Sequence, residues 1–372
     1  MQRTELAPKF RHVVHVFHPI LGSRSFCGIV GTLVARVILV GATVSVSAQP
    51  QNAAWFFGSY AGLDFSAGIP VAVFDGQHAG SACGSVCDTL GELLCYVGPD
   101  VMFNSQHDTL PNGNALYGDQ MRMSPIVIPF PGHPSEYFAF VAKSGGYPDY
   151  DPKAFYHWVD ISANSGDGLC IEKVVVLNDS VSTMVTAIPH ANGTDYWAIF
   201  HEWGSNKFLS YLVNSAGVDS IPVESEAGEV HYDPVGFAVT AIGFLKPSAD
   251  GTQLVLAKTR LSASDCYLDL FDFDPTSGVV SGQLRIADHE RFYAAEFSPN
   301  GQVLYATLFR CDPLETNDLI QFDISVQDSA SINSSRLVLH AAPNQTNCDG
   351  AMGVIAQGPD RRLYVALNTV PY

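Results

Sequence analysis

The residues best suited to chemistry in this chain are His201, Glu202 and Trp203, which directly follow the apolar run 196–200. An adjacent imidazole and carboxylate can bind a cation or act as an acid and a base, and an indole can stack on a sugar. If the run is a β-strand, consecutive side chains point to opposite faces, which argues against one site shared by His201 and Glu202. We therefore keep the three as candidate binding residues, with loop ordering by hydrogen bonds and packing as the commoner role.

His107 is the other candidate binding residue. It lies between Phe103-Asn104 and the turn sequence Pro111-Asn112-Gly113, in what we predict to be the matching region of an earlier repeat unit. Turn residues on both sides favour a hydrogen bond that orders the loop over contact with a ligand.

Two pairs of alternating carboxylates, Asp149 with Asp151 and Asp272 with Asp274, have side chains of the type that binds Ca²⁺. Neither pair has the Asp-x-Asp-x-Asp-Gly spacing and distal Glu of an EF-hand loop. We predict no cofactor and no metal site, with calcium as a weak alternative.

The short motifs of common enzymes are absent from the sequence: it has no Gly-x-Ser-x-Gly elbow, His-Glu-x-x-His helix, Gly-x-Gly-x-x-Gly turn or phosphate-binding loop. We therefore predict no catalytic residue, and the chain is more simply read as a non-enzyme.

A repeated sequence unit predicts the elements that position these residues. Each unit consists of an apolar strand, a turn of Pro, Asp, Asn or Gly residues, and a second apolar strand. The copies span residues 244–257, 297–306 and, more weakly, 354–366. Pro presets φ at a turn and Asn/Asp-Gly supplies the positive φ that folds two strands back on each other. Repetition of this unit predicts the hairpin of a β-propeller blade.

Six segments with β-branched and aromatic residues read as second strands of such hairpins: 93–97, 137–141, 196–200, 254–257, 303–306 and 363–366. Aromatic third strands ending in Asp or Asn follow at 155–160, 208–214, 268–274 and 319–323, and we assign the terminal Asx side chains to turn formation. The prediction is an all-β propeller of six or seven blades.

The chain stops at Tyr372 with the outer strands of the last blade missing, so we expect an incomplete last blade and a fragment or truncated reading frame. Propellers commonly close when an N-terminal strand completes the last blade. Residues 54–57 or 71–74 are the strands we expect to do so.

Residues 1–48 read as a signal peptide and residues 49–372 as the propeller domain. Basic residues precede the apolar run 37–46, and Val46-Ser47-Ala48 suits a cleavage site. The leader carries five Lys/Arg and one Glu, so the remainder has 14 basic and 36 acidic residues and a net charge of −22. We predict a secreted or cell-surface protein that neither binds nucleic acid nor inserts into membranes.

Seven cysteines follow the leader, at positions 83, 87, 95, 170, 266, 311 and 348. In an oxidising compartment some should pair, and the odd number leaves at least one thiol unpaired within the chain. A zinc site at Cys83 and Cys87 is the less favoured alternative, because no second close Cys/His pair completes it.

The chain also resembles a known family along most of its length beyond the leader. The stretches that carry the likeness are 55–65, Pro70-Val-Ala, Asp75-Gly76, Gly91–Tyr96, Phe103–His107, Leu110–Gly113, Thr194–Trp203 and Phe271–Asp274. They resemble the secreted propellers, with WD40/YVTN-like repeats, of gliding-motility bacteria that use type IX secretion. The resemblance implies a cell-surface propeller, described only loosely as adhesive, that is usually followed by further surface domains absent from this chain.

Two functions remain open at this stage. The favoured one is a non-catalytic secreted or cell-surface propeller that binds an extracellular protein or glycan, because a propeller's loops can vary without cost to its core. The alternative is a propeller hydrolase or lactonase with a metal or an acid/base pair in the central channel, which requires histidines and carboxylates such as His201 or Glu202 to converge there.

Overall fold

The computed structural model describes residues 14–17, 52–74, 76, 78–80, 83–98, 100–117, 125–143, 151–231, 242–259, 265–310, 314–343 and 352–367. Among the residues that entered the predictions above, Asp75, Asp149, Cys311, Cys348, Tyr372 and the predicted leader other than residues 14–17 lie outside these ranges.

The described residues are almost entirely strands. The strands are β1 (Val14–Phe17), β2 (Ala54–Ser59), β3 (Ala61–Asp64), β4 (Val71–Val73), β5 (His78–Gly80), β6 (Gly84–Cys87), β7 (Leu93–Val97), β8 (Val101–Asn104), β9 (Thr109–Asn114), β10 (Ile126–Pro129), β11 (Glu136–Lys143), β12 (Lys153–Asp160), β13 (Leu169–Asn178), β14 (Val181–Pro189), β15 (Tyr196–Glu202), β16 (Lys207–Asn214), β17 (Gly217–Val218), β18 (Val223–Glu226), β19 (Ile242–Pro247), β20 (Gln253–Thr259), β21 (Tyr267–Asp274), β22 (Val279–Asp288), β23 (Phe292–Phe297), β24 (Val303–Leu308), β25 (Thr316–Asp323), β26 (Leu337–Pro343), β27 (Met352–Gln357) and β28 (Leu363–Leu367). The helical elements among them are a 3-10 turn at Asn164–Gly166 and α1 (Ser329–Ser334).

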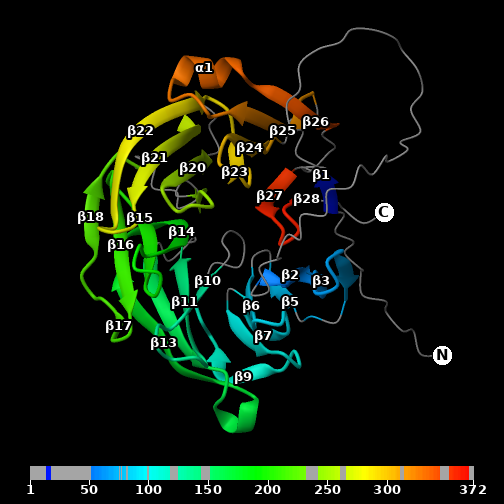
Figure 1. Cartoon of the computed structure of the whole chain (residues 1–372), viewed down its shortest axis with the longest axis vertical. Coiled ribbons are helices and arrows are strands. Elements are labelled where there is room, and N and C mark those ends of the chain that lie inside the picture. Colours follow the sequence, from blue (N-terminus) through cyan, green and yellow to red (C-terminus); the bar gives the residue numbers. More distant parts are fainter. Residues whose placement is uncertain are drawn as a thin grey trace, which may run out of the picture.

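Six antiparallel sheets follow one another in chain order as blades. Blade 1 is β6–β9, blade 2 β10–β13, blade 3 β14–β18, blade 4 β19–β22, blade 5 β23–β26, and blade 6 consists of β27, β28 and β1. The first strands of consecutive blades contact one another from β6 through β27, so the blades are arranged around a common centre (Figure 1). The predicted all-β propeller is confirmed, with six blades of this kind.

A smaller sheet of order β4-β3-β2-β5, which we call the N-terminal sheet, fills the sector between blade 6 and blade 1 (Figure 1). Trp55 of β2 packs edge-on against Tyr364 of β28, with ring centroids 5.5 Å apart. On the other side Phe56 stacks on Tyr96 of blade 1 at 4.5 Å. Because alternate side chains of β2 point to opposite faces, one strand joins both neighbours and the ring is continuous.

The expected closure of the last blade by residues 54–57 or 71–74 is wrong. Those residues form β2 and β4 of the N-terminal sheet, where β2 pairs with β3 and β5. The strand that pairs with β28 is β1, from Val14↔Ala366 to Phe17↔Leu363, and it lies within the predicted leader. Its Val-x-Val alternation suits a strand, but the leader's basic and apolar pattern hid it. The leader boundary at residue 48 stays a prediction.

The repeated turn chemistry is confirmed in blades 4 and 5. In the β19–β20 hairpin Asp250 accepts hydrogen bonds from the Ser248 hydroxyl at 2.6 Å and the Thr252 amide at 3.1 Å, and Gly251 has a φ of 71°. Asn300 takes the same role between β23 and β24, where Gly301 has a φ of 68°. The two sequences therefore fold alike because each supplies an Asx acceptor and a residue free to adopt positive φ.

The weaker third copy, in blade 6, differs at the position that needs positive φ. Arg361 stands there with a φ of 63°, where the other two hairpins have glycine. Its amide still donates to the Gly358 carbonyl at 2.8 Å, and Asp360 accepts from the Arg362 amide at 3.1 Å. The hairpin therefore keeps its geometry, although the Arg361 side chain is sterically disfavoured in the left-handed region.

All six predicted second strands and all four predicted third strands are confirmed, within β7, β11, β15, β20, β24 and β28 and within β12, β16, β21 and β25. The aromatic residues on them fill the spaces between blades, as Phe140 of blade 2 and Phe200 of blade 3 do with centroids 6.4 Å apart. Across the described ranges, no helix has the length and apolar character that crossing a bilayer requires.

Candidate functional site

His201 lies at the end of β15 and is almost completely buried, with 1% of its surface exposed. Its ring stacks on His231 at a centroid distance of 3.7 Å and meets the edge of Phe208 at 4.8 Å. Nδ1 donates a hydrogen bond to the Glu202 carbonyl oxygen, 2.9 Å away. Burial disfavours the charged imidazolium and lowers the pKa of His201 to about 3. This histidine is therefore neutral at physiological pH.

The stack continues from blade 3 into blade 4. His231 follows β18, and its Nε2 lies 2.6 Å from the hydroxyl of Tyr267 on β21. His231 also fixes the loop after β15, because its amide donates to the Ser205 carbonyl and its carbonyl accepts from Gly204. The two imidazoles and the phenol thus connect the second strand of one blade to the third strand of the next.

Two cations cover the Tyr267 ring. The Arg285 guanidinium carbon lies 4.1 Å from the ring centroid, and Nζ of Lys258, a lysine only 5% exposed, lies at 4.9 Å. Arg285 extends from β22, the outermost strand of blade 4. A desolvated cation over an aromatic face is stabilised by the ring quadrupole, so this contact adds to the packing of the two strands.

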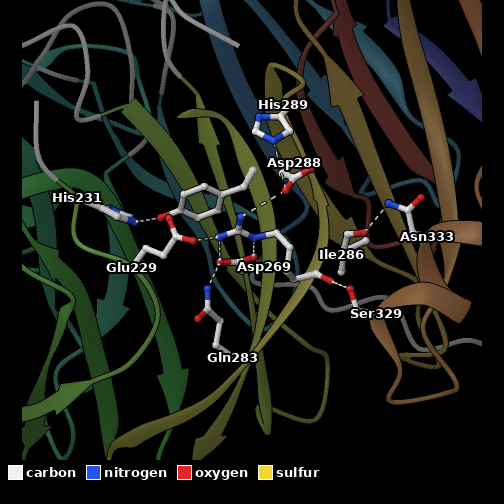
Figure 2. A network of polar contacts seen from close by, with 11 residues as sticks. Glu229, His231, Asp269, Gln283, Ile286, Asp288, His289, Ser329 and Asn333 are labelled. Carbon is white, nitrogen blue, oxygen red and sulfur yellow. Dashed lines mark hydrogen bonds and ion pairs between the residues drawn. The ribbon is translucent and has the colours of Figure 1, made fainter. Parts of the chain in front are cut away.

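Carboxylates hold Arg285 in place (Figure 2). Asp269 on β21 has a fully buried side chain that accepts from Nε and, at 3.2 Å, from Nη2 of Arg285, and from Gln283 at 2.7 Å. Burial raises the pKa of the Asp269 carboxyl, and the bonds from Arg285 and Gln283 oppose that rise. Glu229, on the segment after β18, accepts from Arg285 at 2.8 Å. The Glu229–Arg285 ion pair therefore crosses the boundary between blades 3 and 4, whereas the Asp269–Arg285 pair lies within blade 4.

Helix α1 of blade 5 secures the strand that carries this arginine. The Ser329 hydroxyl donates to the Arg285 carbonyl, and the Asn333 amide donates to the Ile286 carbonyl at 2.9 Å (Figure 2). These two bonds attach α1 to the backbone of β22, the outermost strand of blade 4.

Glu202 and Trp203 take no part in the histidine stack. The Glu202 carboxylate accepts from the Ser205 hydroxyl at 2.7 Å, and the Trp203 amide donates to the Ser180 carbonyl at 3.0 Å. The side chain of Glu202 is half-buried, whereas that of His201 is buried in the interface between blades. The alternation of a strand separates the two, as the sequence indicated.

His107 belongs to a different part of the ring. It follows β8, the third strand of blade 1, while His201 ends the second strand of blade 3, so the expectation of matching positions is wrong. Its backbone has a φ of 67°, and Nδ1 lies 3.1 Å from the Tyr96 hydroxyl. Blade 2 separates the two histidines, and the structure does not bring them together.

The Asx residues that end the third strands are turn formers, as predicted. In every case the side chain accepts a hydrogen bond from the backbone amide two residues on: Asp160 from Ser162, Asn214 from Ala216, Asp274 from Thr276 and Asp323 from Ser325. The hydroxyl and amide donors hold the pKa of the Asp274 and Asp323 carboxyls below the usual range. Over the part of the chain that the structure describes, no group of three or more His, Cys, Asp or Glu side chains is arranged to hold a metal ion.

The five described cysteines, at 83, 87, 95, 170 and 266, do not pair with one another, so the expected pairing is not found among them. Burial raises the pKa of Cys95 to about 12 and that of Cys170 to about 11. At neutral pH these groups are protonated and pack as small apolar side chains.

The exposed apolar residues of the N-terminal sheet form a second feature, which sequence reasoning missed. Ile69, Val71 and Phe74 are 69%, 55% and 77% exposed, and Tyr60 in the β2–β3 turn is 55% exposed. Val73 pairs with Gly62, so Phe74 and Tyr60 lie at the same end of the sheet. We call Tyr60, Ile69, Val71 and Phe74 the β4 patch.

The charged residues of the N-terminal sheet and blade 1 are of one sign. No Lys or Arg occurs between Arg36 and Arg122, a stretch that includes the whole N-terminal sheet and blade 1. The acidic residues in that stretch are Asp64, Asp75, Asp88, Glu92, Asp100, Asp108 and Asp119. This gap in basic residues was visible in the sequence and is the signal that would have directed attention to the sector.

No family model matches the chain, and no curated protein matches it. Among solved structures it is similar to the β-propeller domain of Cps50 (Swd1) from Myceliophteria thermophila, at 11% identity over 86% of this chain and 96% of that one, with a TM-score of 0.45. A candidate 6-phosphogluconolactonase from Bacteroides uniformis is 13% identical over 78% and 82% of the two chains, with a TM-score of 0.45. Sqt1 from Chaetomium thermophilum, bound to the N-terminus of a ribosomal protein, is 13% identical over 83% and 89%, with a TM-score of 0.41.

Such distant likenesses concern the fold, and the sheets described above define the chain as a β-propeller in their own right. Among the described residues, a large polar cluster is buried between blades 3 and 4, and a group of exposed apolar residues lies on the N-terminal sheet.

Proposed function

We propose that this propeller is a non-catalytic binding module whose partner is a protein that docks on the N-terminal sheet. The observation that carries the proposal is the β4 patch: four large apolar side chains, each more than half exposed, lie on a sheet whose own charged residues are all acidic. Exposed large apolar side chains with polar residues around them are typical of protein interaction sites.

The buried network supports this division of roles. His201, His231 and Asp269 are between 0% and 2% exposed, so their polar groups hold blades 3 and 4 together. A ring held in this way is a rigid support, and its variable surface can then carry recognition. Burial of His201 is the reason we favour the binding module over the propeller hydrolase or lactonase.

We also propose that the protein acts outside the cell or on its surface. The basic and apolar pattern of residues 1–48 supports export, but cleavage after residue 48 would also remove β1, which pairs with β28 in blade 6. The acidic chain that follows residue 48 suits a secreted or cell-surface protein. A protein with a basic surface would complement the acidic charge of this chain. An extracellular glycan is the second class of ligand to be tested.

An array of proteins and glycans, probed with the full chain, tests the proposal. Phe74→Lys places a cation in the β4 patch, and Ile221→Lys makes the same change at an 82% exposed position on blade 3. We expect at least one protein ligand that binds the wild type and the Ile221→Lys variant but no longer binds the Phe74→Lys variant. Absence of any protein ligand, or equal loss with both variants, would refute the proposal.

A further inference from the structure

Strand β4 (Val71–Val73) is at the edge of the N-terminal sheet. The strand order is β4-β3-β2-β5, so among the described residues β4 has a neighbour, β3, on one side only. The other side presents backbone N–H and C=O groups that a further strand can pair with. The β3 side of this sheet faces the periphery of the ring, outside β2 in Figure 1.

This edge lacks the charged residues that usually protect an exposed strand. Residues 69–74 read Ile-Pro-Val-Ala-Val-Phe, and Ala72 is exposed together with Ile69, Val71 and Phe74. Proteins commonly place Lys or another charge on such an edge to prevent pairing with other chains. Pro70 stands just before β4, so the amides of Val71 to Val73 are unaffected by it. An unprotected apolar edge is suited to accept a strand.

The charge of the sector selects the partner. A second copy of the chain would bring together two N-terminal sheets whose own residues include acidic side chains and no Lys or Arg, in a protein of formal charge −18. Like charges across an interface oppose association, whereas Lys or Arg beside the added strand would be attracted. The complementary partner is therefore a different protein with a basic segment.

We propose that β4 accepts an extended segment of the partner protein, which adds to the N-terminal sheet as a further strand, with apolar residues on the β4 patch and Lys or Arg at its ends. Main-chain hydrogen bonds to β4 supply affinity, and the side chains that alternate along the segment supply specificity. This inference rests on the proposed function for the existence of a protein partner and adds how that partner binds.

The test uses the full chain and a synthetic peptide of alternating valine and threonine with two lysines at each end. Two control peptides replace the lysines with glutamates or the central valine with proline, which cannot donate a backbone hydrogen bond. Binding is measured by fluorescence anisotropy, and hydrogen–deuterium exchange reports the amides of residues 71–73.

We expect the lysine peptide to bind and to slow exchange at residues 71–73, and the glutamate and proline peptides to bind at least about tenfold more weakly, a loss of about 1.4 kcal/mol or more. Val71→Lys should weaken binding by a similar factor, and Ile221→Lys should not. Thermal melting of both variants verifies that they fold.

Binding of the lysine peptide without protection of residues 71–73, equal binding of the proline peptide, or self-association of the chain through this edge would overturn the strand-addition proposal. The array would still show a protein ligand sensitive to Phe74→Lys in that event, so failure of the binding mode is distinguishable from failure of the proposed function.

Discussion

Acidification should destabilise the propeller through His201, and His201→Gln should remove a defined part of that loss. The wild-type imidazole is buried between blades 3 and 4, and its pKa falls from an ordinary value of 6.5 to about 3 because the charged form loses its hydration. Glutamine has a similar length, cannot titrate in this range and retains an amide that can donate to the Glu202 carbonyl.

The sign follows from proton linkage. Since the pKa is lower in the folded state than in the unfolded state, the unfolded chain binds the extra proton as the pH falls. The stability that neutral His201 contributes is fully present above pH 6.5 and is lost progressively as the pH falls towards 3. Between pH 7 and pH 5 the loss amounts to about 2 kcal/mol for this one histidine.

A second buried histidine offers an internal comparison. His157 in blade 2 accepts a hydrogen bond from the Val174 amide, and burial, assisted by the nearby Lys173 charge, lowers its pKa to about 3 as well. The wild type should therefore lose about 4 kcal/mol between pH 7 and pH 5 from the two histidines together, and His201→Gln about 2 kcal/mol less.

Urea unfolding followed by tryptophan fluorescence at pH 7, 6 and 5 measures these free energies. The quantity to compare is the change with pH in each variant, because His201→Gln also alters stability at neutral pH by removing the stack on His231. An identical pH dependence in the wild type and His201→Gln would refute the assignment of His201 as a buried, neutral group.

Three further predictions follow from the geometry. Arg285→Met leaves the buried Asp269 carboxylate without its cation and should lower the free energy of unfolding by about 3–5 kcal/mol. Lys207→Met breaks a surface ion pair and should lower it by less than about 1 kcal/mol. Equal losses of the two variants in urea unfolding would contradict the buried pair. Gly278→Ala should lower the free energy of unfolding by at least about 1 kcal/mol more than Gly204→Ala does. Both glycines have positive φ, but only at position 278 would a new Cβ lie 2.7 Å from a tryptophan ring. Similar melting temperatures for the two variants would disprove that contact. The affinity of the lysine-flanked peptide, measured by anisotropy titration, should fall steadily as the salt concentration rises. An affinity that does not depend on salt would contradict the claim that acidic residues attract the peptide.

The hairpins of this fold could be predicted from the sequence because their determinants are local. An Asx acceptor and a residue with positive φ lie within five positions of each other in the turns around Asp250 and Asn300. The same holds for the Asx turns that end the third strands. Short-range hydrogen bonds leave a residue pattern that reading along the chain can detect.

The N-terminal sheet and the inter-blade network could not be predicted in this way. Strand β2 has an apolar pattern that suits closure of blade 6 equally well, and only its packing against Tyr364 and Tyr96 places it in a sector of its own. His231 meets Tyr267 from 36 positions away, across two blades, and no local pattern encodes that contact. His201 was singled out as a possible ligand for its chemistry, whereas its burial is a property of the assembled ring.

The central claim is that a partner protein docks on the N-terminal sheet, and site-specific photo-cross-linking tests it most directly. A photoreactive residue is placed at position 74 in one version of the chain and at position 221 in another, and each is irradiated with a protein ligand identified on the array. We predict a covalent adduct from position 74 and none from position 221. Adducts from position 221 alone, or equally from both positions, would contradict the claim.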